Sequence, residues 1–119
     1  MNVIDTETID ALRSLQEEGE DDLLVELIDL FLQDAPGRIA ALRAAVDAGD
    51  WDRVSERAHS LKGSCGSLGA VQMAALCARL EAMGRDAATR PEAPPLQDEI
   101  ERQFGLVRDA LQRERNAAH

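Results

Sequence analysis

The sequence predicts an all-α fold, an antiparallel four-helix bundle with a short extra N-terminal helix. Three observations support this prediction. Apolar residues recur at intervals of three and four over five separate stretches, which is the spacing of helices that bury one face. Aromatic residues make up only 3% of the chain, so the core must be built from aliphatic side chains and methionine. No stretch shows the alternation of a half-buried strand, and helices joined by short connections pack as antiparallel neighbours.

Length and charge limit the possible functions. With 119 residues, the chain is long enough for one domain with a modest core, and we expect a single domain over residues 1–119. Its 13 basic and 23 acidic residues give a formal net charge of −10. Nucleic-acid binding depends on neutralising phosphates with cations, so a chain this acidic is a poor candidate for it.

The sequence contains no signal for a membrane. No apolar run approaches the roughly 20 residues of a membrane span, and the first seven residues are not a secretory signal. We therefore expect a cytoplasmic monomer that does not bind membranes, unless the chain was cut from a larger protein. The initial methionine and the compact length favour a free-standing protein.

The first helix is predicted to begin just after Asp5, which is a suitable N-cap. Ile4 can pack on Ile9 across that cap as a hydrophobic staple. The short apolar face ends where the acidic stretch 17–22 begins, and Gly19 is expected to end the helix.

The second helix contains Pro36, which would normally kink or end it. The apolar residues nevertheless keep the same phase on both sides of the proline, whereas a true break would usually reset it. We therefore predict one helix over about 21–48, bent at Pro36 and ended by Gly49. Its buried stripe is expected to contain Leu24, Ile28, Phe31, Ala35, Ile39, Leu42 and Val46.

The third and fourth helices are predicted over residues 51–67 and 70–83, with a turn near Gly69 between them. Two helices joined by so short a turn form an antiparallel hairpin. A residue ten positions before the turn then faces a residue about ten positions after it. His59 is therefore expected to lie level with Leu80 and Glu81.

The segment 84–95 is rich in proline, alanine and charge, and we expect it to be a loose linker. The last helix is predicted over about 96–113, and residues 114–119 are expected to fray. Its inward side chains would be Leu96, Ile100, Phe104, Val107 and Leu111.

The two cysteines, Cys65 and Cys77, are too few for a disulfide framework and match no zinc-binding spacing. We expect both to be small core residues of a reduced protein.

The candidate chemistry lies on the third helix. His59 is the only internal histidine, and Lys62 and Gly63 fall beside it at the i+3 and i+4 positions. The imidazole is thus held next to a cation with nothing bulky above it. Histidine can act as a nucleophile that carries a covalent intermediate, and its ordinary pKa near 6.5 leaves a neutral nitrogen available. The same spacing is also compatible with an ordinary surface histidine.

The motif around His59 resembles the signature of histidine-containing phosphotransfer (HPt) domains, and the resemblance covers about residues 4–111. The residues that carry it are His59-Ser60-Leu61-Lys62-Gly63, continued by Leu68-Gly69-Ala70. The resemblance implies that His59 accepts a phosphoryl group from a phospho-aspartate on a receiver domain and passes it to another receiver. Lys62 matches the supporting lysine of the family, which would offset the added negative charge. Cys65 and Gly66 stand where family members often carry alanine or asparagine.

The resemblance also implies the partners: response-regulator receiver domains and a hybrid sensor histidine kinase. It implies that this chain has no kinase activity and no cofactor of its own, with Mg²⁺ belonging to the receiver. The segment 51–70 has a net charge of +1 in an otherwise acidic chain, which would suit an acidic docking partner.

Three other residues are candidates for supporting roles. Gly63 would let a partner's active site approach the imidazole, and Glu81 would fix its tautomer by accepting a hydrogen bond from the other ring nitrogen. Ser64 is a candidate contact for phosphoryl oxygens, although a helical serine can equally bond its own backbone. Gly66 is attributed to close packing between helices.

Two other functions compete with the phosphoryl carrier. A sensor-kinase fragment would need an ATP-binding domain with glycine-rich and asparagine boxes, which the chain lacks, and its histidine is usually followed by an acidic residue rather than by Ser60. A phosphorylation-independent docking module would instead bind or sequester a response regulator through the Lys62 face. Substitution of His59 by Gln separates the docking module from the carrier, because a carrier loses its function while a pure binder keeps its affinity.

Overall fold

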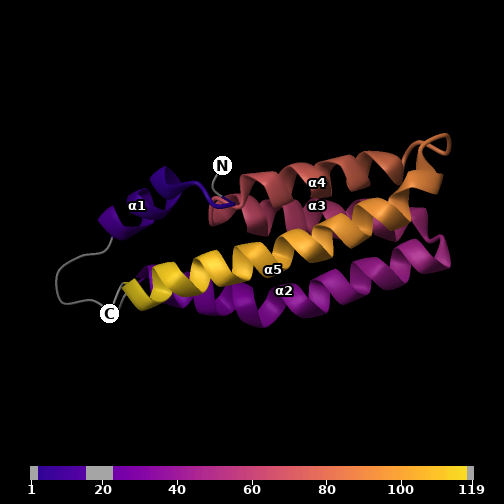
Figure 1. The fold of residues 1–119 in the computed structure, drawn as a ribbon. Helices are drawn as coiled ribbons and strands as arrows, with labels where there is room; N and C mark the ends of the chain where they lie inside the picture. Colours follow the sequence, from indigo (N-terminus) through magenta and orange to yellow (C-terminus); the bar gives the residue numbers. More distant parts are fainter. Residues whose placement is uncertain (1–2, 16–22, 118–119) are drawn as a thin grey trace.

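The structure, a computed structural model, describes residues 3–15 and 23–117. Within these ranges the regular elements are all helices, and they form an elongated bundle of 52 × 25 × 19 Å (Figure 1). The predicted all-α class is confirmed. No helix in the described part is long and apolar enough to span a membrane. The α-helices are α1 (Thr6–Ser14), α2 (Leu23–Ala48), α3 (Trp51–Ser67), α4 (Val71–Met83) and α5 (Ala93–Ala117).

The four long helices pack around one core, with α3 against both α2 and α4 and with α5 completing the bundle (Figure 1). Every residue of the predicted α2 stripe is buried, as is the predicted staple pair Ile4 and Ile9. Phe104, also predicted to face inward, is only partly buried and packs against the core.

Helix α1 is tied to the turn between α3 and α4. Its N-cap, Asp5, accepts a hydrogen bond from the backbone of Glu7 at 3.0 Å, and the Asp5 N–H donates to the Gly69 carbonyl at 2.7 Å. Gly69 has a φ of +75°, and a Cβ there would lie 3.0 Å from the Asp5 carbonyl oxygen. The turn therefore requires glycine for both its conformation and its close contact. Helix α1 ends at Ser14, and Gly19, the predicted stop, lies outside the described residues.

Helix α2 runs without interruption through Pro36, as the phase of its apolar residues predicted. An interior proline costs about 3 kcal/mol or more, because it removes a backbone hydrogen bond and crowds the preceding turn. Here Pro36 is exposed, while Ala35 and Ile39 on either side of it are buried in the core. Burial along the whole stripe offsets the local penalty and keeps the helix continuous. The helix begins at Leu23, and its predicted start at residue 21 lies outside the described residues.

Helix α5 begins earlier than the sequence indicated. The segment 84–95 was expected to be a loose linker, but Arg90–Glu92 forms a 3-10 turn and α5 starts at Ala93. Pro94 and Pro95 thus occupy the first helical turn. Proline is tolerated there because the first N–H groups of a helix have no partner within the helix, so its missing donor costs nothing.

This connection is also anchored rather than loose. The Arg90 guanidinium donates to the carbonyl of Gly84 at 3.0 Å and lies over the ring of Trp51, 5.2 Å from its centroid. The tryptophan at the start of α3 thus has a structural role. A cation on an aromatic face holds the end of α4 against the start of α3.

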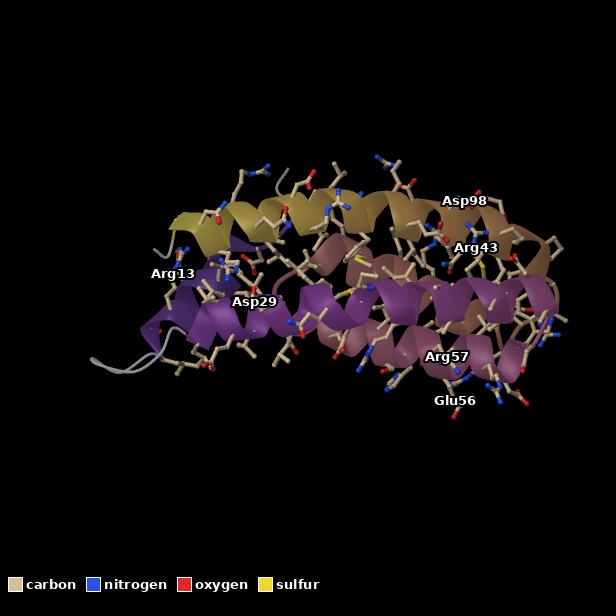
Figure 2. The ribbon with its side chains drawn as sticks, turned by 90° about the horizontal axis from the view of Figure 1, so that it is seen from below. Arg13, Asp29, Arg43, Glu56, Arg57 and Asp98 are labelled. Atoms are coloured by element: carbon tan, nitrogen blue, oxygen red, sulfur yellow. The ribbon has the colours of Figure 1, made fainter. Side chains whose placement is uncertain are left out.

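The C-terminal end is likewise more ordered than predicted. Residues 114–119 were expected to fray, but α5 continues through residue 117, and only 118–119 lie outside the described residues. Ion pairs to two other helices fix this last turn at the end of the bundle where Arg13 and Asp29 lie (Figure 2). The pairs are Arg13–Glu114 at 2.8 Å and Arg115–Asp29 at 2.6 Å.

Cys65 and Cys77 are free thiols, and both are completely buried, as predicted. Hydrogen bonding with Cys77, together with burial, raises the pKa of the Cys65 thiol far above its ordinary value. Because the thiolate is the reactive form, this cysteine is a packing residue at neutral pH.

Candidate functional site

The middle of α3 presents His59 to solvent. Its side chain is 67% exposed, because the opposite side of the helix is buried in the bundle. The start of the helix is set by Asp50, whose carboxylate accepts from the Arg53 N–H at 3.4 Å. The buried stripe that orients the helix consists of Val54, Ala58, Leu61 and Cys65.

Glu81 of α4 lies beside the imidazole, at the level that the hairpin geometry predicted. The two Glu81 carboxylate oxygens are 3.2 and 3.3 Å from His59 Nδ1. An ionised carboxylate can only accept hydrogen bonds, so in the neutral imidazole this contact favours the tautomer with its proton on Nδ1. The lone pair of Nε2 is then left free on the exposed edge of the ring.

Two basic side chains also lie close to the same carboxylate. Lys62 Nζ donates to it at 3.0 Å, and an Arg85 guanidinium nitrogen lies 3.9 Å away. The hydrogen bond from Lys62 chiefly holds the pKa of Glu81 below its ordinary value; partial burial opposes that shift, and the His59 contact adds to it. Glu81 is therefore ionised at neutral pH, although its side chain is only 14% exposed.

Ser55 of α3 and Gly84, the residue that follows α4, set how closely the backbone at Glu81 approaches α3. The hydroxyl of Ser55, one turn before His59, donates to the Glu81 carbonyl at 2.8 Å. A Cβ on Gly84 would lie 2.2 Å from Ser55 Oγ and 2.8 Å from the Trp51 carbonyl oxygen. A glycine at this position therefore lets α4 approach α3 closely enough for the Ser55 bond to form.

Gly63 and Gly66 both face open space. A Cβ at either position would meet no atom within 4 Å, so the predicted role of Gly66 in close helix packing is wrong. A glycine inside a helix costs about 0.5–1 kcal/mol relative to alanine, and packing within the bundle does not require it at either position. The absence of a side chain at Gly63 leaves the surface next to His59 unobstructed.

Ser64 lies on the other flank of α3. It is five residues from His59, which is roughly 140° around the helix, and its hydroxyl donates to the Ser60 carbonyl at 3.4 Å. Arg38 of α2 donates to the hydroxyls of Ser60 and Ser64 at 2.9 and 3.3 Å. Of the predicted site residues, Lys62 and Glu81 are thus gathered around the imidazole, while Ser64 faces α2.

The sequence reasoning missed three residues of this region. Arg85 stands four residues after Glu81 on a helix, so the i, i+4 rule could have identified it. Ser55 and Arg38 gave no such signal, because their partners lie on other helices and are 26 and 22 residues distant in sequence.

The resulting site is a shallow hollow rather than a closed pocket. Its lining residues are Asp52, Ser55, Glu56, His59, Glu81 and Arg85. In the described part of the chain, no three His, Cys, Asp or Glu side chains are grouped so as to hold a metal ion. The chemistry that this surface offers is a nucleophilic nitrogen, accessible to a large partner and bordered by two cations.

Two proteins with similar sequences come from a plant and a yeast. Histidine-containing phosphotransfer protein 2 of Arabidopsis thaliana is 35% identical over 69 residues, which are 56% of this chain and 44% of that protein. Multistep phosphorelay regulator 1 of Schizosaccharomyces pombe is 28% identical over 112 residues, or 90% of this chain and 38% of that protein. The chain therefore spans less than half the length of these relatives.

A solved structure and the Hpt family signature also match most of the chain. The crystal structure of histidine-containing phosphotransfer protein B (HptB) from Pseudomonas aeruginosa PAO1 superimposes with a TM-score of 0.84 and 34% identity, covering 96% of this chain and 95% of that one. The Hpt domain signature matches residues 26–117, which include the exposed histidine, its lysine and the carboxylate that orients the ring. On this combined evidence the chain belongs to the Hpt domain family.

Proposed function

We propose that this chain is a phosphorelay intermediate, which accepts a phosphoryl group on His59 from a phospho-aspartate of one receiver domain and passes it to another receiver. The observation that carries the proposal is the contact between Nδ1 and Glu81, which leaves Nε2 unprotonated on an exposed ring. The Nε2 lone pair forms the N–P bond while the P–O bond to the aspartyl carboxylate breaks, and that carboxylate leaves with the bonding electrons. Transfer to the second receiver reverses these steps.

Glu81 and Lys62 have complementary roles in this proposal. Formation of the N–P bond gives the ring positive charge, and Glu81, which holds the Nδ1 proton, stabilises that charge. Lys62 is 37% exposed and lies on the same carboxylate, so it is within reach of the negative phosphoryl oxygens. Phosphoryl transfer needs mainly in-line positioning and charge stabilisation from the protein, and these groups supply both.

Gly63 and Ser64 are proposed to support the transfer in addition to Glu81 and Lys62. Gly63 gives the partner's active site access to Nε2, which agrees with the open space around its Cα. Ser64 is the weaker of the two proposals, because its hydroxyl already bonds the Ser60 carbonyl and accepts from Arg38. A contact with phosphoryl oxygens would require the hydroxyl to leave the Ser60 carbonyl, because it has only one proton to donate.

In this proposal the chain is a carrier and not an enzyme in its own right. The matched Hpt signature takes up most of the chain, and the residues around His59 offer a nucleophile and cations. Mg²⁺ would be supplied by the receiver, and the hybrid kinase would start the relay.

The test is phosphoryl transfer from a panel of receiver domains, each labelled on its aspartate with Mg²⁺ present, to wild type and to His59→Gln. The wild type is expected to gain an acid-labile, base-stable label, and the variant to gain none. Because His59 is exposed, the variant should fold as the wild type does, which circular dichroism would check. A label of equal size on the variant would overturn the assignment of His59.

A docking module that does not depend on phosphorylation is the second candidate. It is favoured by an apolar groove of about 210 Å³ between α2 and α3, beside Ser64, into which Leu30 contributes a side chain that is 57% exposed. Under this function a receiver would bind wild type and His59→Gln equally well, and neither would become labelled. The remaining apolar lining of the groove comes from Leu27, Phe31, Ala35, Leu61 and Leu68.

A further inference from the structure

The seam between α2 and α3 carries three arginines close to the phosphoacceptor histidine. Arg38 of α2 and Arg53 and Arg57 of α3 line one hollow together with Glu56 and Ser60, and we call these three arginines the arginine seam. Figure 2 shows Glu56 and Arg57 on the outer side of α3, the helix that lies beside α2 in this view.

The charge of the arginine seam is poorly neutralised within the chain. Arg57 is exposed and has no hydrogen bond or ion pair to any described residue, and Arg38 bonds only the neutral hydroxyls of Ser60 and Ser64. Arg53 pairs with its own N-cap, Asp50, at 3.2 Å. By contrast, Arg43 and Arg115, the arginines that join α2 to α5, bond carboxylates directly (Figure 2).

The seam is also continuous with the surface that must be covered during transfer. Ser60 directly follows His59, and Glu56 lines both the hollow of the seam and the hollow around His59. A protein that brings an aspartyl phosphate up to Nε2 therefore places its own surface over, or next to, the arginines.

Screening by salt limits the distance over which the charges of this chain act on such a partner. The chain as a whole has a net charge of −10, which would repel an acidic partner. At physiological salt, however, interactions between exposed charges are largely screened beyond about 8 Å. The positive seam beside His59 therefore dominates at contact distance, and the acidic surfaces farther away contribute little.

We infer that the arginine seam selects the partner, binding receiver domains that carry Asp and Glu side chains on the surface around the site of their phosphorylated aspartate, outside the Mg²⁺ ligands. This inference rests on the proposed phosphoryl transfer and adds the chemistry by which a receiver is recognised. Charges at the rim of an interface act mainly on association rate and salt dependence, so the seam should affect KM and leave kcat unchanged.

The experiment measures initial rates of transfer from the phosphorylated receiver that labels the wild type, at varied receiver concentration and at low and high NaCl. The variants are Arg57→Glu, Arg57→Gln and the matched control Arg113→Glu. Arg113 is likewise exposed, has no hydrogen bond or ion pair to any described residue, and lies in the last turns of α5 near the Arg13–Glu114 pair. Both charge reversals change the net charge equally, so general repulsion cancels in the comparison.

We expect Arg57→Glu to raise KM roughly 5- to 10-fold at low salt and less than about 2-fold near 0.5 M NaCl, where the Debye length is only a few ångströms. Arg57→Gln should show a smaller rise, and Arg113→Glu should stay within about 2-fold of wild type. Reversal of one acidic residue on the receiver's surface, outside its Mg²⁺ ligands, should restore KM for Arg57→Glu.

The possible failures are distinguishable. A wild type that gains no label from any receiver would overturn the proposed function, and this inference with it. If the wild type is labelled normally but Arg57→Glu and Arg113→Glu have the same KM, only the arginine seam loses its role. A fall in kcat of Arg57→Glu at saturating receiver would also overturn the inference, since it would show an effect on the transfer step.

Discussion

The two flanks of α3 differ in how firmly they are bound to their neighbours. On the flank facing α4, Glu81 joins the imidazole, Lys62 and Arg85 through one ionised carboxylate, and Ser55 fixes its backbone. On the flank facing α2, Arg38 reaches only two hydroxyls, and an open apolar groove with an exposed Leu30 lies beside them. The histidine lies between a fixed flank and an open one.

This difference indicates a division of labour. Groups that set a tautomer must be held within a few tenths of an ångström, and the close packing of α3 against α4 provides that precision. Groups that recognise another protein need exposed, unsatisfied charge and apolar surface, which the α2 flank retains. Three substitutions would break or sharpen this comparison.

The largest effect is expected for Gly84→Ala, which disturbs the fixed flank. The new methyl group would lie 2.2 Å from Ser55 Oγ and 2.8 Å from the Trp51 carbonyl, so α4 must move away from α3. We expect a loss of about 1–3 kcal/mol in the free energy of unfolding, measured with urea, because overpacking costs that much. Transfer to His59 should also slow as Glu81 is displaced.

Gly105→Ala is the matched control for this change. Position 105 lies inside α5 and a Cβ there would meet no atom within 4 Å, so the variant should gain about 0.5–1 kcal/mol from its higher helix propensity. A Gly84→Ala protein as stable as wild type would contradict the close approach of α4 to α3.

A smaller effect is expected for Gly63→Ala, on the exposed strip between the flanks. The methyl group enters open space, so the free energy of unfolding should rise by about 0.5–1 kcal/mol. If Gly63 provides access for the partner, the transfer rate should nevertheless fall by several fold. Gly66→Ala, which is equally unobstructed, should gain the same stability and keep the wild-type rate. Equal rates for the two variants would remove the access role of Gly63.

The smallest effect is expected for Glu81→Gln, which keeps the shape of the fixed flank and removes its charge. The folded-state pKa of Glu81 is lowered, chiefly by Lys62. A carboxyl with a lowered pKa adds stability above its unfolded pKa, about 4.3, and loses it as the pH falls through the lower folded value. The wild type should exceed the variant by up to about 1 kcal/mol at neutral pH, since the ion pair is partly exposed.

Urea unfolding of wild type and Glu81→Gln from neutral pH down to about pH 3 measures this difference. The gap should be constant well above the ordinary glutamate pKa and should close below it. A gap that remains unchanged in acid would show that the charge of Glu81 contributes nothing and that only its size matters.

Much of the fold follows from local pattern. The phase of the apolar residues predicted a continuous α2 across Pro36, and the position of Gly69 predicted the hairpin that brings Glu81 to His59. These inferences succeed because helical periodicity and short turns are properties of neighbouring residues. The linker 84–95 and the tail 114–119 were predicted less well, because contacts with residues distant in sequence determine their structure. Arg90 lies over Trp51 in the linker, and Glu114 and Arg115 pair with residues of α1 and α2 in the tail.

The sequence by itself determined the helical class, the hairpin and the choice of His59, Lys62, Gly63 and Glu81 as candidates, since each depends on spacing along one helix or across one turn. Only the tertiary structure decided which flank each side chain occupies. It placed Ser64 toward α2, left Gly66 in open space and brought Ser55 and Gly84 together behind Glu81. The physical reason is that distances between helices are set by the packing of the whole core, to which every helix contributes.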